Sequence, residues 1–304
     1  NNITLPLLII GYIHPQNYEH LFDLKNIYLF VSNLEQASAL SAAAEKQNQL
    51  VNIFLKIDTG MSRQGVLADS ALVFFQTTQK MHSLNISGVA THFASADDLS
   101  DPTFFNEQLF SFTKIKNILS KLKPDLIFSA SNSAGALVYS EAHFDLIRPG
   151  ISIYGLLPDY RQKENYSQHN IDLKPILSWK THITQIKNIP AGSKISYGLT
   201  YTAPQDMTIA ILPIGYYDGL DRKLSNTGEV IINGQFVPII GRVCMDLTII
   251  DVSHIPNIAT EDEVIIIGKQ KTAEITADDL AQKIGTINYE VTTRIRETMP
   301  RVIV

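Results

Sequence analysis

The stretch VNIFLKIDTG, residues 51–60, indicates how the first half of the chain folds. It starts with a short run of β-branched and large apolar residues, which ends at the polar residues Lys56 and Asp58. Continuous apolar runs of this length are typical of strands covered on both faces, as in parallel sheets. The stretch therefore predicts a buried parallel strand with polar side chains at its carboxyl end.

Similar apolar runs recur on both sides of this stretch, separated by helical patterns. One pattern starts at Ser32, with Glu35 three residues later as in a capping box; others cover residues 70–82 and 103–122. The alternation predicts either a doubly wound sheet or a (β/α)8 barrel. No G-x-G-x-x-G turn follows a strand, which disfavours a dinucleotide-binding fold. The six predicted strands are residues 7–10, 27–31, 51–57, 86–91, 126–129 and 146–153.

The second half of the chain has a different pattern. Residues 160–170 are polar and predict a linker or loop. Asn233-Gly234 lies between two apolar runs and predicts a β-hairpin, and residues 248–252 and 264–267 predict further strands. Residues 276–284 predict a short capped helix that ends at Gly285. We therefore expect an α/β domain over residues 1–166 and a mostly antiparallel β domain over residues 167–304.

Composition excludes several classes of protein. The net charge is −5 and the basic residues are scattered, so nucleic acid is not an expected partner. Cys244 is the single cysteine, which excludes an intrachain disulfide and fits a reducing cytoplasm. No signal peptide is visible, and the early apolar run is far shorter than the ~20 residues of a membrane span. We expect a cytoplasmic protein that has no membrane partner.

Polar residues recur where the predicted strands end, and in a barrel these ends meet at one mouth. Lys56 either pairs with Asp58 near the surface or helps to position Arg63, whose guanidinium fork suits a ligand anion. His92 is either a hydrogen-bonded core residue or a functional group at the mouth. These residues remain open between a structural and a functional role.

The later strand ends offer a phosphate site. Asn132 and Ser133 are either the cap of a helix or donors to a phosphate. Arg148 lies in an apolar run, which is costly unless the charge is paired, and Gly150 would let a ligand approach the backbone closely. TIM-type barrels often bind phosphate near their last strands.

The second half contributes two tyrosines beside glycines, Tyr197 and Tyr216, which are either turn residues or site residues. Cys244 is one sulfur without a cluster and without a clear histidine partner. The sequence therefore predicts no metal site and no cysteine nucleophile.

Taken together, eight stretches that span nearly the whole chain resemble those of alanine racemases, the fold-type III pyridoxal-phosphate (PLP) enzymes, in the same order. They are LKIDTGMSRQG (55–65), GVATHFASAD (88–97), SNSAGAL (131–137), IRPGISIYG (147–155), ISYGLTYTA (195–203), LPIGYYDG (212–219), GRVCMD (241–246) and INYE (287–290). The resemblance implies a PLP-binding α/β barrel followed by a β domain. It also implies racemisation of alanine, which supplies D-alanine for peptidoglycan. A head-to-tail homodimer is implied too, in which each site combines one barrel with the partner's β domain.

The resemblance also implies roles for individual residues around the cofactor. Arg148 would face the pyridine nitrogen, and Arg63 would contact the phenolic oxygen and the substrate carboxylate. Lys56 matches a lysine that is carbamylated in many members. The phosphate would be held by Ser133, Gly150, Ile151 and Tyr289, with Asn132 as a further cofactor contact.

The remaining implied roles concern proton transfer and the substrate. Tyr197 of the partner subunit would be a catalytic base, and His92 would lie against the ring and link Arg148 to it. The backbone of Met245 would bind the substrate carboxylate, and Tyr216 would help to line the entrance.

One family motif has no counterpart in this sequence. The family's Schiff-base lysine lies in a motif of the form V-K-A-N-A-Y-G-H-G at the end of the first barrel strand, together with a phosphate-binding tyrosine. The chain begins at what would be the third strand, so we expect a TIM-type barrel without its first two βα units. We also expect that the gene product is longer and that this chain is a fragment or a cleaved form.

Three alternatives remain open. The chain is also compatible with a broader amino-acid racemase, or with a PLP decarboxylase of the same fold. Such decarboxylases usually carry a Cys-Asp pair, whereas here Met245 lies between Cys244 and Asp246. The third alternative is a non-catalytic interaction subunit without PLP, which the missing lysine favours and the retained cofactor residues disfavour.

Overall fold

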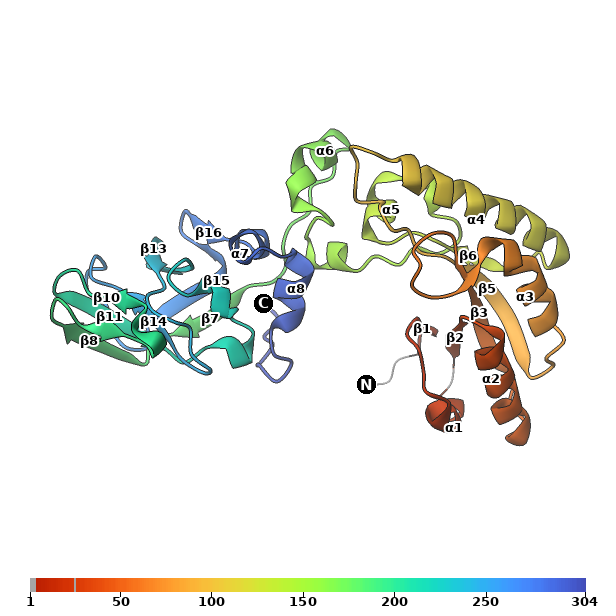
Figure 1. Ribbon diagram of the computed structural model, residues 1–304, viewed down its shortest axis with the longest axis horizontal. Coiled ribbons are helices and arrows are strands. Elements are labelled where there is room, and N and C mark those ends of the chain that lie inside the picture. Colours follow the sequence, from red (N-terminus) through yellow and green to blue (C-terminus); the bar gives the residue numbers. More distant parts are fainter. Residues whose placement is uncertain (1–3, 25) are drawn as a thin grey trace. The chain divides into compact units, whose positions relative to one another are not determined.

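The computed structural model describes residues 4–24 and 26–304, which form two compact units (Figure 1). The first unit extends to residue 153 and includes residues 157–173. The second unit comprises residues 154–156 and 174–304. Each unit is described separately.

The first unit is built on a parallel sheet with the strand order β1-β2-β3-β5-β6, and the short strand β4 also pairs with β3. Neighbouring strands follow one another along the chain, as they do around part of a TIM-type barrel. Five of the six predicted strands are confirmed. Their bounds are β1 Leu7–Ile9, β2 Ile27–Val31, β3 Val51–Asp58, β4 Val66–Leu67, β5 Leu84–Ala90 and β6 Ile127–Ser129. That two further βα units precede this sheet stays a prediction.

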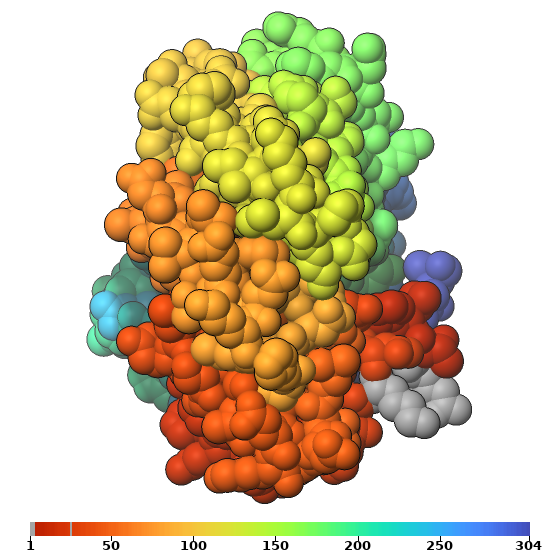
Figure 2. Space-filling model, turned by 90° about the vertical axis from the view of Figure 1, so that its right-hand side faces the viewer, coloured from red at the N-terminus to blue at the C-terminus, as the bar shows by residue number. Residues whose placement is uncertain are grey.

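Three helices cover one face of this sheet: α2 (Leu34–Lys46), α3 (Ala71–Thr78) and α4 (Thr103–Leu122) (Figure 1). Figure 2 looks onto this helical side. Alternate residues of β3, including Ile53 and Leu55, belong to the core cluster that also contains buried side chains of these helices. Phe54 instead packs with Phe30 and Ala90 in a separate cluster, which the alternation of strand side chains places on the opposite face. Burial on both faces explains the continuous apolar runs in the sequence.

Three sequence-based expectations about this unit were wrong in detail. Residues 146–153 form no strand: the N–H groups of residues 145 and 146 both donate to the carbonyl of Phe128, and Pro149 lacks a backbone donor. The cap of α2 is Asn33 rather than Ser32, because Asn33 Oδ1 accepts from the N–H of Gln36 (2.7 Å). Residues 160–170 contain helix α6, which buries Tyr166. The other helices are α1 Tyr18–Phe22, α5 Ser133–Val138, α6 Lys163–Gln168 and 3-10 turns at Pro15–Asn17, Ala68–Ser70, Ser140–Ala142, Ile151–Tyr154 and Tyr160–Gln162.

The second unit is mostly antiparallel β, as predicted. One sheet has the order β14-β11-β8 and another the order β13-β12-β15-β16, with β7 paired to β15. The predicted hairpin is β12–β13, in which Asn233 and Gly234 both have positive φ angles, as a two-residue turn requires. The strands are β7 Trp179–His182, β8 Gln185–Ile189, β9 Lys194–Ile195, β10 Tyr201–Thr202, β11 Met207–Leu212, β12 Glu229–Ile232, β13 Gln235–Pro238, β14 Thr248–Asp251, β15 Glu263–Gln270 and β16 Ala273–Ile275.

Two helices complete this unit, α7 (Ala277–Ile284) and α8 (Asn288–Arg294). The predicted capping box of α7 is present: Thr276 and Asp279 bond to each other's backbone N–H, and Gly285 ends the helix in the left-handed region. Three 3-10 turns lie at Tyr197–Leu199, Tyr216–Asp218 and Arg222–Leu224. Among the described residues, no helix combines the length and the apolar character needed to cross a membrane.

Candidate functional site

The carboxyl ends of β3, β5 and β6 meet at one edge of the first unit because these strands are parallel neighbours. Lys56 lies beside Ala90 in the register of β3 and β5, and its side chain is only 5% exposed. His92 follows β5, and the N–H of Arg148 donates to the carbonyl of Ser131 just beyond β6 (3.0 Å). The structure thus brings together three basic residues that the sequence analysis singled out.

The guanidinium of Arg148 is held by neutral acceptors. Its Nη1 donates to Ser129 Oγ, and its Nη2 donates to the carbonyls of Thr91 (2.7 Å) and Ala130 (3.2 Å). The same Nη2 lies 3.5 Å from Nδ1 of His92. These bonds fix the direction of the guanidinium while leaving its positive charge uncompensated.

Burial and mutual repulsion lower the pKa values of the basic groups at this edge. Burial first, and then repulsion from Arg148 and Arg63, together lower the pKa of Lys56 to about 7 against a weaker attraction by Asp58. Burial and the charges of Arg148, Lys56 and Arg63 lower the pKa of His92 to about 3. Burial and Arg63 lower the pKa of Arg148 to about 10. An anion bound at this edge would therefore reduce the repulsion among these positively charged side chains.

Arg63 lies on a loop shaped by Asp58. The carboxylate oxygen Oδ1 of Asp58 accepts hydrogen bonds from the N–H groups of Gly60 (2.9 Å) and Ser62 (3.1 Å). Gly65 has a φ of 114°, and a Cβ there would overlap the backbone of β3, so this loop needs glycine. Asp58 thus organises the loop rather than neutralising Lys56, and the exposed Arg63 is close enough to repel Lys56, His92 and Arg148.

Ser133 and the segment after Arg148 form a cradle of polar groups. Ser133 Oγ accepts from the N–H of Gly150 (2.8 Å) and from that of Ser152 (3.4 Å). A Cβ added at Gly150 would meet nothing within 4 Å except Ser133 Oγ at 4.0 Å, so the space beside the Cα of Gly150 is open. Asn132 is the cap of α5, since its Oδ1 accepts from the N–H of Gly135 (3.0 Å).

Gln108 is a further residue of this site that the sequence analysis missed. It is 1% exposed on α4; its amide donates to the carbonyl of His92 (3.1 Å) and to Thr59 Oγ1 (3.3 Å), and its Oε1 accepts from the N–H of Ala94 (2.8 Å). It ties the end of β5 to the loop after β3. Its signal in the sequence is a glutamine at helical spacing among the buried residues Phe105 and Phe112.

Three loops of the second unit gather the other predicted residues. Ser196 Oγ donates to the carbonyl of Arg242 (2.6 Å), which joins the Tyr197 turn to the segment before Met245. The N–H of Tyr216 donates to the carbonyl of Cys244 (3.0 Å), so the Tyr216 turn joins the same segment. Tyr197 is 72% exposed and Met245 53% exposed. The structure thus brings Tyr197, Tyr216 and Met245 onto neighbouring loops.

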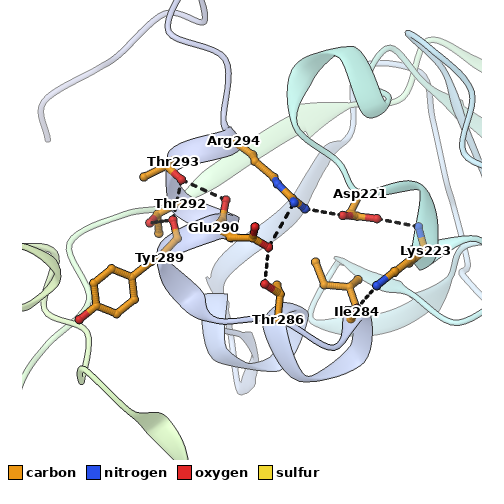
Figure 3. A network of polar contacts seen from close by, with 9 residues as sticks. All are labelled: Asp221, Lys223, Ile284, Thr286, Tyr289, Glu290, Thr292, Thr293 and Arg294. Carbon is orange, nitrogen blue, oxygen red and sulfur yellow. Dashed lines mark hydrogen bonds and ion pairs between the residues drawn. The ribbon is translucent and has the colours of Figure 1, made fainter. Parts of the chain in front are cut away.

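Tyr289 lies on α8, which a polar network fixes to the rest of the second unit (Figure 3). Arg294 donates to Asp221 (2.7 Å) and pairs with Glu290 (3.1 Å), and Glu290 also accepts from Thr286 Oγ1. The ring of Tyr289 lies on the opposite side of the helix from this network (Figure 3). Among the described residues, no three His, Cys, Asp or Glu side chains are grouped as a metal site would need.

Comparison with known proteins identifies the family. The sequence matches the family models "Alanine racemase, N-terminal domain" over residues 1–158 and "Alanine racemase, C-terminal domain" over residues 176–303. The chain belongs to the alanine racemase family. It is therefore a racemase, an enzyme of the isomerase class.

Individual alanine racemases are similar to this chain along almost its whole length. The alanine racemase of Halothermothrix orenii is 42% identical over 300 residues, which is 98% of this chain and 77% of the relative. The structure of alanine racemase from Bacillus anthracis with bound L-Ala-P is 30% identical and has a TM-score of 0.88, covering 97% of this chain and 74% of that one. The enzyme of Bartonella henselae with covalently bound pyridoxal phosphate is 26% identical with a TM-score of 0.81, covering 98% and 79%.

Proposed function

We propose that this racemase interconverts L- and D-alanine with pyridoxal 5'-phosphate as its cofactor. The cluster of basic groups at the strand ends of the first unit carries this proposal. Its positive charges repel one another, and a bound anion would reduce that repulsion. The relatives named above support alanine as the substrate and, in one case, pyridoxal phosphate as the cofactor. A cytoplasmic role in supplying D-alanine for peptidoglycan is part of the same proposal.

The residues of the first unit suit the charges of this cofactor. The open space at Gly150, beside Ser133 Oγ, suits a phosphate, for which Ser133 and the N–H groups of Gly150 and Ile151 would be the donors. Asn132 and Tyr289 complete the proposed set of phosphate residues. Arg148 would face the pyridine nitrogen, and Arg63 would contact the phenolic oxygen. When bound, the cofactor supplies a ring that delocalises the charge developing at the substrate α-carbon.

Racemisation requires acid–base groups on both sides of the α-carbon, because the proton leaves one face and returns to the other. We propose Tyr197 of the partner subunit as the group on one face, with His92 linking it to Arg148. The reference pKa of a tyrosine is ~10, so nearby cations such as Arg148 would help it to lose its proton. The family assigns the other face to a lysine within a motif that residues 1–304 do not contain.

The substrate would be held by its carboxylate. Arg63 offers a guanidinium, and the backbone N–H of Met245 a further donor, while Tyr216 would line the entrance. On this proposal residues 1–166 bind the cofactor, and residues 167–304 contribute to the site of the partner. The exposed apolar surface of Tyr197, Leu199, Met245 and Leu247 supports burial of these loops in a head-to-tail homodimer.

Lys56 is suited to carbamylation. Its pKa near 7 leaves a large fraction of its amine unprotonated at neutral pH, and the neutral amine is the form that attacks CO₂. The reaction forms an N–C bond and releases one proton, giving a carbamate anion beside Arg63 and Arg148. A ¹³C carbamate resonance should appear with labelled bicarbonate in the parent protein and be missing in Lys56→Met. Identical spectra for the two proteins would contradict the assignment.

The function is tested by incubating the complete gene product with pyridoxal phosphate and L-alanine, and measuring D-alanine by chiral chromatography. We expect D-alanine to accumulate until the two enantiomers are equal. L-serine and L-lysine serve as comparison substrates that reveal a broader racemase, and release of CO₂ would reveal a decarboxylase. A protein that binds no pyridoxal phosphate and racemises none of the three amino acids would refute the proposal.

A further inference from the structure

Ser196, the residue before Tyr197, has a backbone conformation that is almost restricted to glycine. Its φ is 62° and its ψ is −176°. The next residues continue the irregularity, since Gly198 and Leu199 have φ angles of 70° and 53°. Non-glycine residues occupy such regions only where the surrounding structure forces them to, and such residues cluster at functional sites.

Contacts with the neighbouring loop hold Ser196 in this conformation. Its Oγ donates to the carbonyl of Arg242 (2.6 Å) and lies 3.5 Å from Cys244 Sγ. On the same loop Gly241 has a φ of 72°, and a Cβ there would lie only 2.8 Å from Ser196 Cβ. The absence of a side chain at Gly241 thus allows the two backbones to approach and the hydroxyl to reach its acceptor.

The direction of Tyr197 follows from this backbone. The tyrosine side chain is 72% exposed, so packing within its own unit restrains the ring little. The rotation of the chain at Ser196 therefore sets where the Cα–Cβ bond of Tyr197 points. A free chain would sample many conformations here, and a catalytic group that is displaced by about 1 Å loses much of its effect.

We propose that Ser196 is a positioning residue, whose glycine-like backbone, locked by its hydroxyl to Arg242, aims the Tyr197 phenol for proton transfer. The inference rests on the proposed function, in which Tyr197 is a catalytic base. It assigns a role to Ser196 rather than to Tyr197. It predicts that the Ser196 hydroxyl and the backbone conformation at Ser196 are both needed to direct the tyrosine.

Two substitutions separate these contributions. Ser196→Ala removes the hydroxyl but keeps the Cβ that makes this backbone conformation costly, whereas Ser196→Gly removes the hydroxyl and can adopt the same conformation without strain. Lys271→Gly is the matched control, because Lys271 also has a positive φ (55°) and its Nζ donates to a backbone carbonyl, that of Asn233 (2.9 Å). Lys271 lies in the turn between β15 and β16 and has no place in the proposed site.

The experiment combines amide hydrogen exchange, read by mass spectrometry on peptides that cover residues 195–201, with racemisation kinetics. In Ser196→Ala we expect exchange in this segment to be at least about tenfold faster, kcat to fall by about tenfold or more, and KM to change less than about twofold. Ser196→Gly should be intermediate in both respects, because glycine loses the hydroxyl but keeps the native backbone conformation accessible. Lys271→Gly should match the parent protein in the 195–201 segment and in kcat.

Unchanged exchange in both Ser196 variants would overturn the proposal, and so would faster exchange with an unchanged kcat. Melting temperatures of all variants, and exchange elsewhere in the second unit, show whether a loss reflects general unfolding. If Ser196→Ala unfolds generally, Ser196→Gly decides the question alone. If the parent protein racemises no amino acid, the proposed function fails, whereas the exchange comparison needs no turnover and still shows whether Ser196 fixes the segment.

Discussion

At the scale of single residues, the first unit concentrates positive charge at the carboxyl ends of its strands. The guanidinium of Arg148 donates hydrogen bonds to Ser129 Oγ and to two backbone carbonyls. These partners are neutral, so they do not compensate its positive charge. Asp58 attracts Lys56 but is engaged with the loop backbone. The cost of this arrangement is an imidazole that is neutral near pH 7 and an amine that is only partly protonated there. On the proposed function, its benefit would be a positive field that favours the phosphate and phenolate of the cofactor and the carboxylate of the substrate.

Lys56 should make the stability of the cofactor-free protein depend on pH. Its pKa is about 7 when folded and 10.5 in the reference state, so the unfolded chain binds more protons between these values. The free energy of unfolding therefore gains a contribution that rises with pH from 7 to 10.5, by at most about 1.4 kcal/mol per pH unit. Lys56→Met should remove this contribution. Urea denaturation between pH 7.5 and 9.5 measures it, and parallel curves for the two proteins would contradict the depressed pKa.

Arg148 should protect the enzyme from a side reaction. A guanidinium stays charged and gives up no proton to a ring nitrogen at neutral pH, so that nitrogen would remain unprotonated. Arg148→Glu offers a group that can share a proton with it, which would strengthen electron withdrawal by the ring. We expect transamination to rise by about tenfold relative to racemisation. Pyruvate formed from alanine is the measurement, with Arg148→Met as the control without a carboxyl group. An unchanged ratio of transamination to racemisation in Arg148→Glu would contradict this role of Arg148.

At the scale of elements, the hydrophobic pattern predicted the helices and strands that have periodic or continuously apolar sequences. It did not predict segments whose conformation depends on a few contacts with residues distant in the sequence. The strands β2, β3, β5 and β6 and the helix α4 were predictable because their cores are periodic or continuously apolar. Residues 146–153 are as apolar as a strand, yet the loop that ends at Arg148 is fixed by hydrogen bonds to Phe128, Ser129 and Ser131, which no local pattern encodes. Gln108 and Ser196 were missed for the same reason, since each acts through partners distant in the sequence.

The candidate site residues also divide into those that the sheet topology predicts and those that it does not. Lys56 and His92 lie at the ends of neighbouring parallel strands, so the sheet alone was enough to predict that they meet. Arg148 reaches them from a loop, and its place depends on hydrogen bonds that no local pattern encodes. Asn132 had two possible roles, and the structure shows it as a helix cap. That it also contacts a phosphate stays a prediction. The assignment of Tyr197 and Met245 needed the family resemblance, because nothing in their local pattern distinguishes site residues from turn residues.

Helix α8 should depend on Arg294 for its precise placement rather than for its existence. Arg294 joins the helix to Asp221 and pairs with Glu290 within the helix. All three side chains are partly exposed, so Arg294→Ala should lower stability by only ~0.5–1 kcal/mol. Affinity for pyridoxal phosphate should fall more clearly, by roughly threefold to tenfold, because the proposed phosphate ligand Tyr289 lies on this helix. Fluorescence titration with the cofactor measures the change.

The control for Arg294 is Lys180→Ala, which breaks another exposed ion pair of the second unit, that with Glu263 (3.0 Å). This variant should lose a comparable amount of stability and keep the cofactor affinity of the parent protein. Equal affinities in the two variants would show that the network around α8 stabilises the unit without orienting Tyr289.

At the scale of the whole molecule, the proposed machinery is divided between two units. The basic cluster and the phosphate cradle belong to the first, and the loops with Tyr197, Tyr216 and Met245 belong to the second. Three of these loop side chains and the neighbouring Leu247 are large, apolar or aromatic, and exposed. A self-complementary pairing of two copies would cover them and place a tyrosine from one copy at the basic cluster of the other.

Mixing two inactive variants tests this division directly. Arg148→Ala damages the first-unit part of a site and Tyr197→Phe the second-unit part, so each homodimer should be nearly inactive. If each site combines parts of two copies, a hybrid dimer has one intact site and one site with both defects. Random exchange makes half of the dimers hybrid, which should restore about a quarter of the parent activity. Unfolding and refolding a 1:1 mixture, followed by a racemisation assay, measures the recovered activity.

Mixing Arg148→Ala with His92→Ala is the control and should restore no activity, because both defects lie in the first unit. No recovery in the first mixture, when mass spectrometry shows that hybrids have formed, would mean that each chain supplies its own tyrosine.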